Sequence, residues 1–297
     1  MQVQVERLTK RYGDTVAVDE LSFAARPGRV TGFLGRNGAG KSTTLKVLVG
    51  LAAPSSGSAT FDGRRYAQLD AAPRWVGALL EQEAYHPART ARNHLRMMAA
   101  GVGIPDQRCD EVLGLVGMAD HGDTRVGAYS LGMRQRLGLA CALLGDPPVL
   151  LLDEPGNGLD PQGLRWLRNL LRWRADQGGT VLVSSHQLAE VQLLADDLVV
   201  IDRGRLVHAG LVDELATAGV RVRTPTPGPL VDALEASGAQ VERRGEHALL
   251  VTGVDVATVG EAAHGADVVL HELVSETTSL EDVFVGMTGD EDQEVPA

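Results

Sequence analysis

The sequence predicts an α/β fold built on a parallel sheet that helices cover on both faces. The 297 residues, 44% of them hydrophobic and 23% charged, have the composition of a globular protein with one large domain or two smaller ones. From Thr43 onward, short apolar segments alternate with helix-like segments, a pattern typical of parallel sheets buried on both faces. The strands expected from these segments are 76–80, 149–152, 181–184 and 198–201.

Two further parts are expected to join this core. Residues 1 to about 30 alternate apolar and polar side chains around turns at 12–14 and 26–28, which predicts an N-terminal antiparallel β subdomain. Residues 91–144 have a helical pattern almost throughout, which predicts a helical subdomain at about 85–145.

The composition changes after about Thr217, and a proline-rich segment at 224–229 reads as a turn or linker. The elements expected after it follow the order β-α-β-β-α-β, which is the split βαβ arrangement. We therefore predict a main domain at 1–216, a small α+β accessory domain at 217–289, and an acidic disordered tail at 290–297. The expected strands are 220–223, 239–243, 247–252 and 267–273, and the expected helices are 230–236, 256–264 and 280–287.

Charge and hydropathy exclude some classes of function. A net charge of −11 and a pI near 5.2 argue against a nucleic-acid-binding surface, which needs clustered Lys and Arg. No apolar run is long enough to cross a bilayer, and Met1 to Lys10 contain no signal-peptide core. If the protein works at a membrane, we expect it to dock on another chain.

The most informative motif is a glycine-rich loop at 35–42, which reads Gly-Arg-Asn-Gly-Ala-Gly-Lys-Ser between an apolar run and a helix-like run. Glycines at its first and sixth positions let the backbone curl around a polyphosphate with its N–H groups pointing inward. Lys41 would supply charge to the β- and γ-phosphates, and Ser42 would reach Mg²⁺. A chance glycine-rich turn is a poorer explanation, because the flanking strand and helix are both in place. The predicted nucleotide-binding residues are Gly35, Arg36, Asn37, Gly38, Ala39, Gly40, Lys41, Ser42 and Thr43.

Two carboxylates follow the apolar run at 149–152, at the strand end where open α/β sheets bind ligands. Asp153 would hold Mg²⁺, directly or through water. Glu154 would act as general base toward the attacking water. The alternative, in which both residues only cap the next loop, is weaker because the chain already contains a phosphate loop.

With these motifs, the chain resembles the ATP-binding subunits of ABC transporters over roughly residues 3 to 215. The family signature, usually Leu-Ser-Gly-Gly-Gln, corresponds to Tyr-Ser-Leu-Gly-Met at 129–133, which keeps Ser130 and Gly132 and departs at Leu131 and Met133. The resemblance implies a P-loop NTPase core of the ABC ATPase type. The signature variant, and the segment 279–284 near the end of the chain, resemble ABC-2 exporter subunits that act on drugs or antibiotics.

The resemblance also implies roles for further residues. Asp160 corresponds to the D-loop and would lie at a dimer interface, and His186 would be the switch histidine that contacts the γ-phosphate. Tyr12 would stack on adenine. At the Q-loop, alignment places Glu81 at the usual glutamine position, and a shift of one residue makes Gln82 the working side chain toward Mg²⁺ and water. The adjacent segment 83–92 would contact a membrane partner.

Taken together, the resemblance implies an ATPase with Glu154, His186 and Gln82 as catalytic residues and with ATP and Mg²⁺ as ligands. Two copies would close head to tail, so that Lys41 of one copy faces Ser130 of the other. A separate transmembrane permease would place this homodimer at the cytoplasmic face of the cell membrane, to power export of a drug, antibiotic or other amphiphile. The alternatives are an ABC-type ATPase of translation or DNA maintenance, and a module that binds nucleotide without hydrolysing it.

Overall fold

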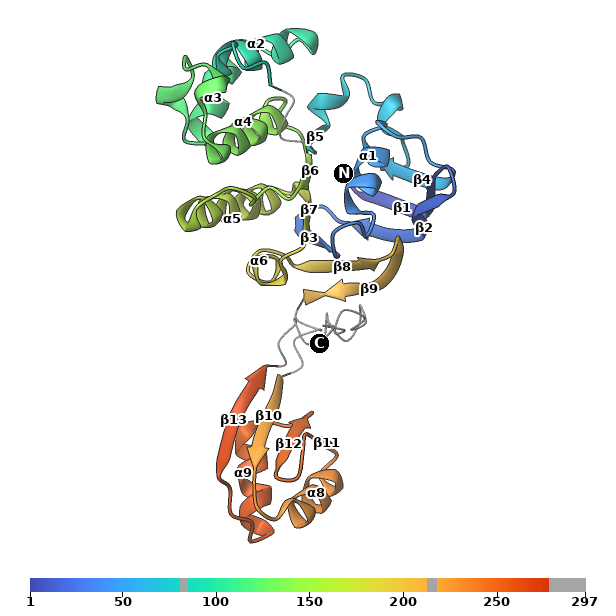
Figure 1. The fold of residues 1–297 in the computed structure, drawn as a ribbon, viewed down its shortest axis with the longest axis vertical. Helices are drawn as coiled ribbons and strands as arrows, with labels where there is room; N and C mark the ends of the chain where they lie inside the picture. Colours follow the sequence, from blue (N-terminus) through green and yellow to red (C-terminus); the bar gives the residue numbers. More distant parts are fainter. Residues whose placement is uncertain (81–84, 213–217, 278–297) are drawn as a thin grey trace, which may run out of the picture. The chain divides into compact units, whose positions relative to one another are not determined.

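The computed structural model describes residues 1–80, 85–212 and 218–277, and the chain divides into two compact units, Met1–Leu211 and Val212–Ala297 (Figure 1). The predictions for Glu81, Gln82, the helix at 280–287 and the tail at 290–297 lie outside the described residues.

The core of the first unit is a six-stranded sheet in the order β5-β6-β7-β3-β8-β9. The first five strands are parallel, as expected, and their central members are almost wholly buried. These strands are β5 (Val76–Leu79), β6 (Val149–Asp153), β7 (Thr180–Ser185), β3 (Arg29–Leu34) and β8 (Asp197–Asp202).

The sheet has one edge strand that was not expected from the sequence. Strand β9 (Arg205–Leu211) runs antiparallel to β8. The two-residue turn between them has positive φ at both positions, 46° at Arg203 and 81° at Gly204, which is the geometry that tight hairpins need. Because β9 is an edge strand with no fully buried residue, it lacks the continuous apolar run that marked the other strands.

A second, three-stranded antiparallel sheet packs on this core in the order β2-β1-β4. Its hydrophobic contact with the main sheet includes Phe23 of β2 stacked on Phe33 of β3, with ring centroids 5.1 Å apart. The N-terminal antiparallel sheet was expected, whereas its third strand was not. The strands are β1 (Val3–Tyr12), β2 (Thr15–Ala25) and β4 (Ser56–Phe61).

Helices cover the main sheet, and the helical subdomain lies beside β5 (Figure 1). Its last helix approaches β5 closely because glycines leave room: a Cβ at Gly77 would lie 1.9 Å from the Ala142 carbonyl oxygen. Within the described residues, no helix has the length and apolar character needed to cross a membrane. The α-helices are α1 (Lys41–Leu48), α2 (Ala91–Gly101), α3 (Gln107–Leu115), α4 (Leu131–Leu143), α5 (Pro161–Asp176) and α6 (Leu188–Gln192); 3₁₀ turns lie at Tyr66–Gln68, Ala72–Arg74, Ala119–His121 and Val126–Ala128.

The second unit is a four-stranded antiparallel sheet, ordered β11-β12-β10-β13, with two helices. Its chain order is β-α-β-β-α-β. Alternate residues of the central strands, such as Val220 and Val251, share a core with helix residues such as Leu234 and Val259. The elements are β10 (Ala218–Arg223), α8 (Pro227–Ala236), β11 (Gln240–Arg243), β12 (Ala248–Thr252), α9 (Val256–Gly265) and β13 (Glu272–Thr277).

The last strand was expected too early, at 267–273. The apolar run 268–270 does not pair in the sheet. Instead, the Val268 N–H donates to the Ala263 carbonyl, and the Val268 side chain is buried in the core beside α9. The apolar run therefore packs at the C-terminal end of α9, and the strand begins only at Glu272.

Candidate functional site

The glycine-rich loop joins β3 to α1 with a backbone shape that only glycine permits at key points. Gly40, the residue before α1, has φ of 105°, and Gly38 has φ of 82°, both in the left-handed region. A Cβ on Gly40 would lie 2.5 Å from the Ala17 carbonyl oxygen, and one on Gly35 would lie 2.6 Å from the Ile201 carbonyl oxygen. The loop is thus shaped by local conformation and by close contact with the surrounding sheet.

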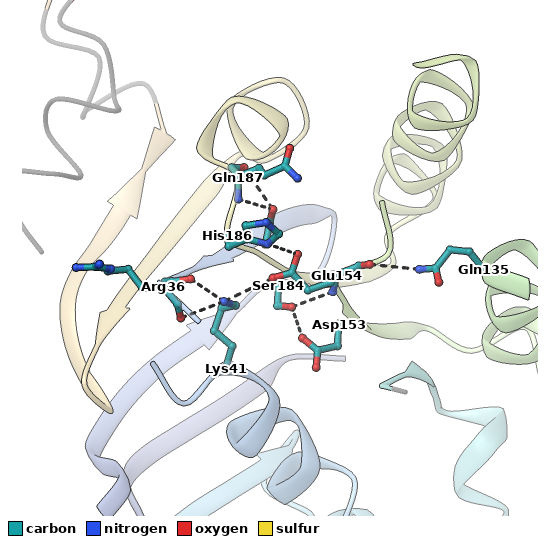
Figure 2. A network of polar contacts seen from close by, with 10 residues as sticks. Arg36, Lys41, Gln135, Asp153, Glu154, Ser184, His186 and Gln187 are labelled. Atoms are coloured by element: carbon teal, nitrogen blue, oxygen red, sulfur yellow. Dashed lines mark hydrogen bonds and ion pairs between the residues drawn. The ribbon is translucent and has the colours of Figure 1, made fainter. Parts of the chain in front are cut away.

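Lys41 is the first residue of α1, and its side chain is only 6% exposed. Its Nζ donates hydrogen bonds to the carbonyl oxygens of Gly35, at 2.6 Å, and Arg36, at 3.4 Å. The same atom lies 3.5 Å from Oε1 of Glu154 (Figure 2). The loop therefore holds a buried ammonium group at the amino end of a helix, where the helix dipole also favours negative charge.

A cavity of about 190 Å³ opens over this loop. Its lining combines the backbone of the loop, the lysine and one carboxylate, which suits a phosphate group at a helix start. Eight of the nine loop residues predicted from the sequence line the cavity, while Gly35 contributes its carbonyl to Lys41. The lining residues are Ala17, Arg36, Asn37, Gly38, Ala39, Gly40, Lys41, Ser42, Thr43 and Glu154.

Asp153 ends strand β6, Glu154 follows it directly, and Ser184 of the neighbouring strand binds both residues. The Ser184 hydroxyl donates to Oδ1 of Asp153 and accepts from the Glu154 N–H at 3.0 Å. Glu154 has φ of 47°, a left-handed conformation that costs a non-glycine residue energy. A buried hydroxyl therefore helps to hold both carboxylates at the sheet edge.

The contacts of the site meet at Glu154 (Figure 2). Its Oε1 faces Lys41, and its Oε2 lies 2.9 Å from Nδ1 of His186. The Glu154 carbonyl accepts from Nε2 of Gln135 at 3.3 Å, and Gln135 is 1% exposed. A cation, a carboxylate and an imidazole thus adjoin at the loop cavity, an arrangement that can bind an anion and move a proton beside it.

Sequence reasoning missed the roles of Ser184 and Gln135. Ser184 carried a signal, since it is a polar residue at the carboxyl end of an apolar strand, where ligands bind in parallel sheets. Gln135 had no such signal in the sequence, because it lies on a helix and contacts Glu154 at a strand end 19 residues away.

The two other predicted loops lie next to each other and cap helices. The Ser130 hydroxyl accepts from the Met133 N–H at the start of α4, and Asp160 Oδ1 accepts from the Gly163 N–H at the start of α5. A Cβ on Gly132 would lie 3.0 Å from the Gly158 carbonyl oxygen. Among the described residues, neither Ser130, Gly132 nor Asp160 lines the loop cavity of its own chain.

Tyr12 and the Q-loop complete the predicted set. Tyr12 ends β1 with 49% of its surface exposed, and the Lys10 Nζ lies 4.6 Å from its ring centroid. It is absent from the described lining of the loop cavity. Glu81 and Gln82 lie outside the described residues, so the choice between them stays a prediction.

We predict that Ser184→Ala lowers the free energy of unfolding of the first unit by about 1–3 kcal/mol, because Asp153 loses its hydroxyl donor in a partly buried setting. Urea denaturation followed by tryptophan fluorescence would report on this unit, since all three tryptophans lie in it.

Ser58→Ala is the matched control for this measurement, because in the described part of the chain the Ser58 hydroxyl donates only to exposed Glu6, at 3.4 Å. We expect that change to stay within about 0.5 kcal/mol. Equal unfolding curves for the two variants would contradict the supporting role of Ser184.

Comparison with known proteins places these motifs in context. The family described as "ABC transporter" matches residues 18–157, and a domain of unknown function matches residues 218–281. Along 306 aligned residues the chain is 37% identical to the uncharacterized ABC transporter ATP-binding protein YhcH of Bacillus subtilis (strain 168), covering 99% of this chain and 98% of that protein.

Three further similarities are informative. The chain is 40% identical over 216 residues to the bacitracin transport ATP-binding protein BcrA of Bacillus licheniformis, covering 72% of this chain and 71% of BcrA. It is 34% identical over 302 residues to the Nod factor export ATP-binding protein I of Burkholderia orbicola (strain AU 1054), covering 98% of each. A solved structure described as the ATP binding subunit of an ABC transporter superposes with a TM-score of 0.66 at 28% identity, covering 72% of this chain and 92% of that one.

Proposed function

This chain belongs to the ATP-binding proteins of ABC transporters, and from that premise we propose that it hydrolyses ATP to power export of a drug, antibiotic or other amphiphile through a separate membrane subunit. The observation that carries the catalytic part is the Glu154 carboxylate, which lines the loop cavity between Lys41 and His186. Export is supported by the names of two relatives, which are described as bacitracin transport and Nod factor export proteins.

The loop residues fit a nucleoside triphosphate. Lys41 would turn from the loop carbonyls to the β- and γ-phosphates, and the start of α1 would face their negative charge. Ser42 is exposed and lines the loop cavity, and Asp153 lies at the end of β6, so these two residues would hold Mg²⁺. When bound, Mg²⁺ neutralises phosphate charge and favours departure of the leaving group.

Glu154 would then act as general base. It takes a proton from water as the water oxygen bonds to the γ-phosphorus, and the bond from that phosphorus to the bridging oxygen of ADP breaks. His186, 2.9 Å from Glu154, orients the carboxylate and can contact the γ-phosphate. Gln82 would position the water from the Q-loop, and Tyr12 would stack on adenine.

We propose a head-to-tail homodimer, because the Ser130 and Asp160 loops adjoin each other and neither lines the loop cavity of its own chain among the described residues. In the dimer, the start of α4 would bring Ser130 and Gly132 against the γ-phosphate held by the partner copy. ATP would thus close the dimer, and hydrolysis would reopen it and reset the permease at the cytoplasmic face of the membrane.

A role in translation or DNA maintenance has less support. The relatives named above are transport proteins. DNA-maintenance ATPases would need a long coiled coil between loop and signature, whereas α2 and α3 of the described residues have 11 and 9 residues.

The test of the function is ATP turnover by the purified chain, alone and together with its membrane partner in lipid vesicles. We expect Mg²⁺-dependent release of phosphate, and stimulation by cargo when the partner is present. ATP binding without any turnover in both preparations would favour the nucleotide-holding module instead.

The composite site predicts that two inactive variants restore each other. Lys41→Ala removes the phosphate lysine, and Ser130→Asp keeps a good helix cap while placing a carboxylate against the partner's phosphates. In an equal mixture, about half of the dimers contain one of each and therefore one complete site, so turnover should recover to about a quarter of the normal value. Full activity of Ser130→Asp alone would contradict a site shared between subunits.

A further inference from the structure

A second cavity, of about 180 Å³, lies between strands β3 and β7 and helices α5 and α6. Most of its wall is apolar and comes from buried side chains of all four elements, including Val30, Leu167, Val183 and Val191, and from Leu194 just after α6. Among the loop-cavity residues only Glu154 also lines this cavity, so the two spaces are separate and share one carboxylate as a wall.

One end of this cavity is charged. Besides Glu154, its lining includes Glu190 of α6 and Arg168 of α5. Oε2 of Glu190 lies 3.0 Å from the position that a Cβ on Gly156 would occupy, so the carboxylate packs against the chain just after Glu154. Glu190 is partly buried and, within the described parts of the chain, makes no hydrogen bond or ion pair.

The surroundings of Glu190 disfavour its negative charge. Burial raises the pKa of Glu190, and the charge of Glu154 raises it further, while His186 and Arg168 lower it by less. A bound cation would stabilise the charged form of this carboxylate, because its attraction offsets both the cost of burying the charge and the repulsion from the neighbouring carboxylate.

We propose that this cavity binds small apolar cations, with the apolar body among Val30, Leu167 and Val191 and a protonated amine at Glu190. The size fits, since a dry apolar cavity of about 150 Å³ accepts benzene. The two carboxylates outnumber Arg168 at this end of the cavity, so an anion of the same size is disfavoured, and a neutral molecule leaves Glu190 without a cationic partner. Because Glu154 and α6 form part of the wall, a cation bound in this cavity should also slow ATP hydrolysis without displacing ATP.

Three aromatic probes of similar size test the charge preference on the full chain without nucleotide: benzylamine, benzyl alcohol and benzoate. Isothermal titration should give benzylamine the lowest Kd, about tenfold below that of benzyl alcohol, and no binding of benzoate. In Glu190→Gln the preference for the amine should disappear. Glu111→Gln, an exposed carboxylate outside this cavity, should retain it.

Filling the cavity tests the location. Two substitutions place a leucine side chain in the cavity. Ala195 is a buried lining residue, and Ala189 is an exposed lining residue on α6, where a larger side chain is least harmful to folding. Both should abolish binding of benzylamine and benzyl alcohol, and if Ala195→Leu does not fold, Ala189→Leu decides. Unchanged benzylamine affinity in Glu190→Gln or in the filled variant would overturn the proposal. Binding is measured without ATP, so failure of the ATPase assignment would leave this result standing.

Discussion

Glu154→Gln should lower ATP turnover by about 10²–10⁴-fold while leaving ATP binding intact, since that is the range that a positioned general base contributes. Glutamine keeps the size of the side chain and its hydrogen bond to His186 but cannot take a proton from water at neutral pH. It also removes the negative charge 3.5 Å from the Lys41 ammonium, which should not weaken the attraction of Lys41 for phosphate.

Two measurements separate binding from chemistry in this variant. Titration with a fluorescent ATP analogue should give a Kd near the unmodified value, and size-exclusion chromatography with ATP should show a trapped closed dimer. Glu111→Gln is the control, because that exposed carboxylate lies far from the loop in the sequence and, among the residues that the structure describes, pairs only with its helix neighbours. Normal steady-state turnover by Glu154→Gln would remove Glu154 from the role of base.

The sequence was most informative where the signal is local. The loop at 35–42 could be predicted because its spacing, the strand before it and the helix after it lie within one continuous segment. The buried parallel strands could be predicted for a similar reason: β6 and β7 have uninterrupted apolar runs, and such runs need no knowledge of their neighbours.

Features that depend on distant contacts could not be predicted in the same way. Ser184 bonds to Asp153 across 31 residues, and Gln135 reaches Glu154 from a helix in a separate subdomain. Strands β4 and β9 are partly exposed, so their residue patterns resemble those of loops until the partner strand is known.

Leu131 shows how a departure from a family motif can have a structural reason. It stands where the usual signature has glycine, and it is 51% exposed. A Cβ on Gly158, whose φ is 78°, would lie 2.5 Å from the Leu131 side chain. Leu131 therefore packs directly on the segment that leads to Asp160, and it joins the two segments that contain Ser130 and Asp160 into a single surface.

Lys41→Ala should weaken ATP binding by about 10- to 100-fold, which corresponds to the loss of charge-assisted hydrogen bonds worth about 1.5–3 kcal/mol. The lysine is 6% exposed and already sits at the loop cavity, so little side-chain freedom is lost when phosphate arrives. The loop backbone and the start of α1 remain in the variant, and they explain why residual binding is expected.

Direct titration with ATP and with adenosine separates the contribution of the phosphates to the binding affinity from that of the adenosine part. The affinity for adenosine, which has no phosphate, should be unchanged in Lys41→Ala, and only the affinity for ATP should fall. Lys46→Ala is the control on the same helix, because Lys46 lies outside the described lining of the loop cavity. If ATP affinity were unchanged in Lys41→Ala, the ammonium would not contact the phosphates, and the carbonyl contacts to Gly35 and Arg36 would then have to be its whole role.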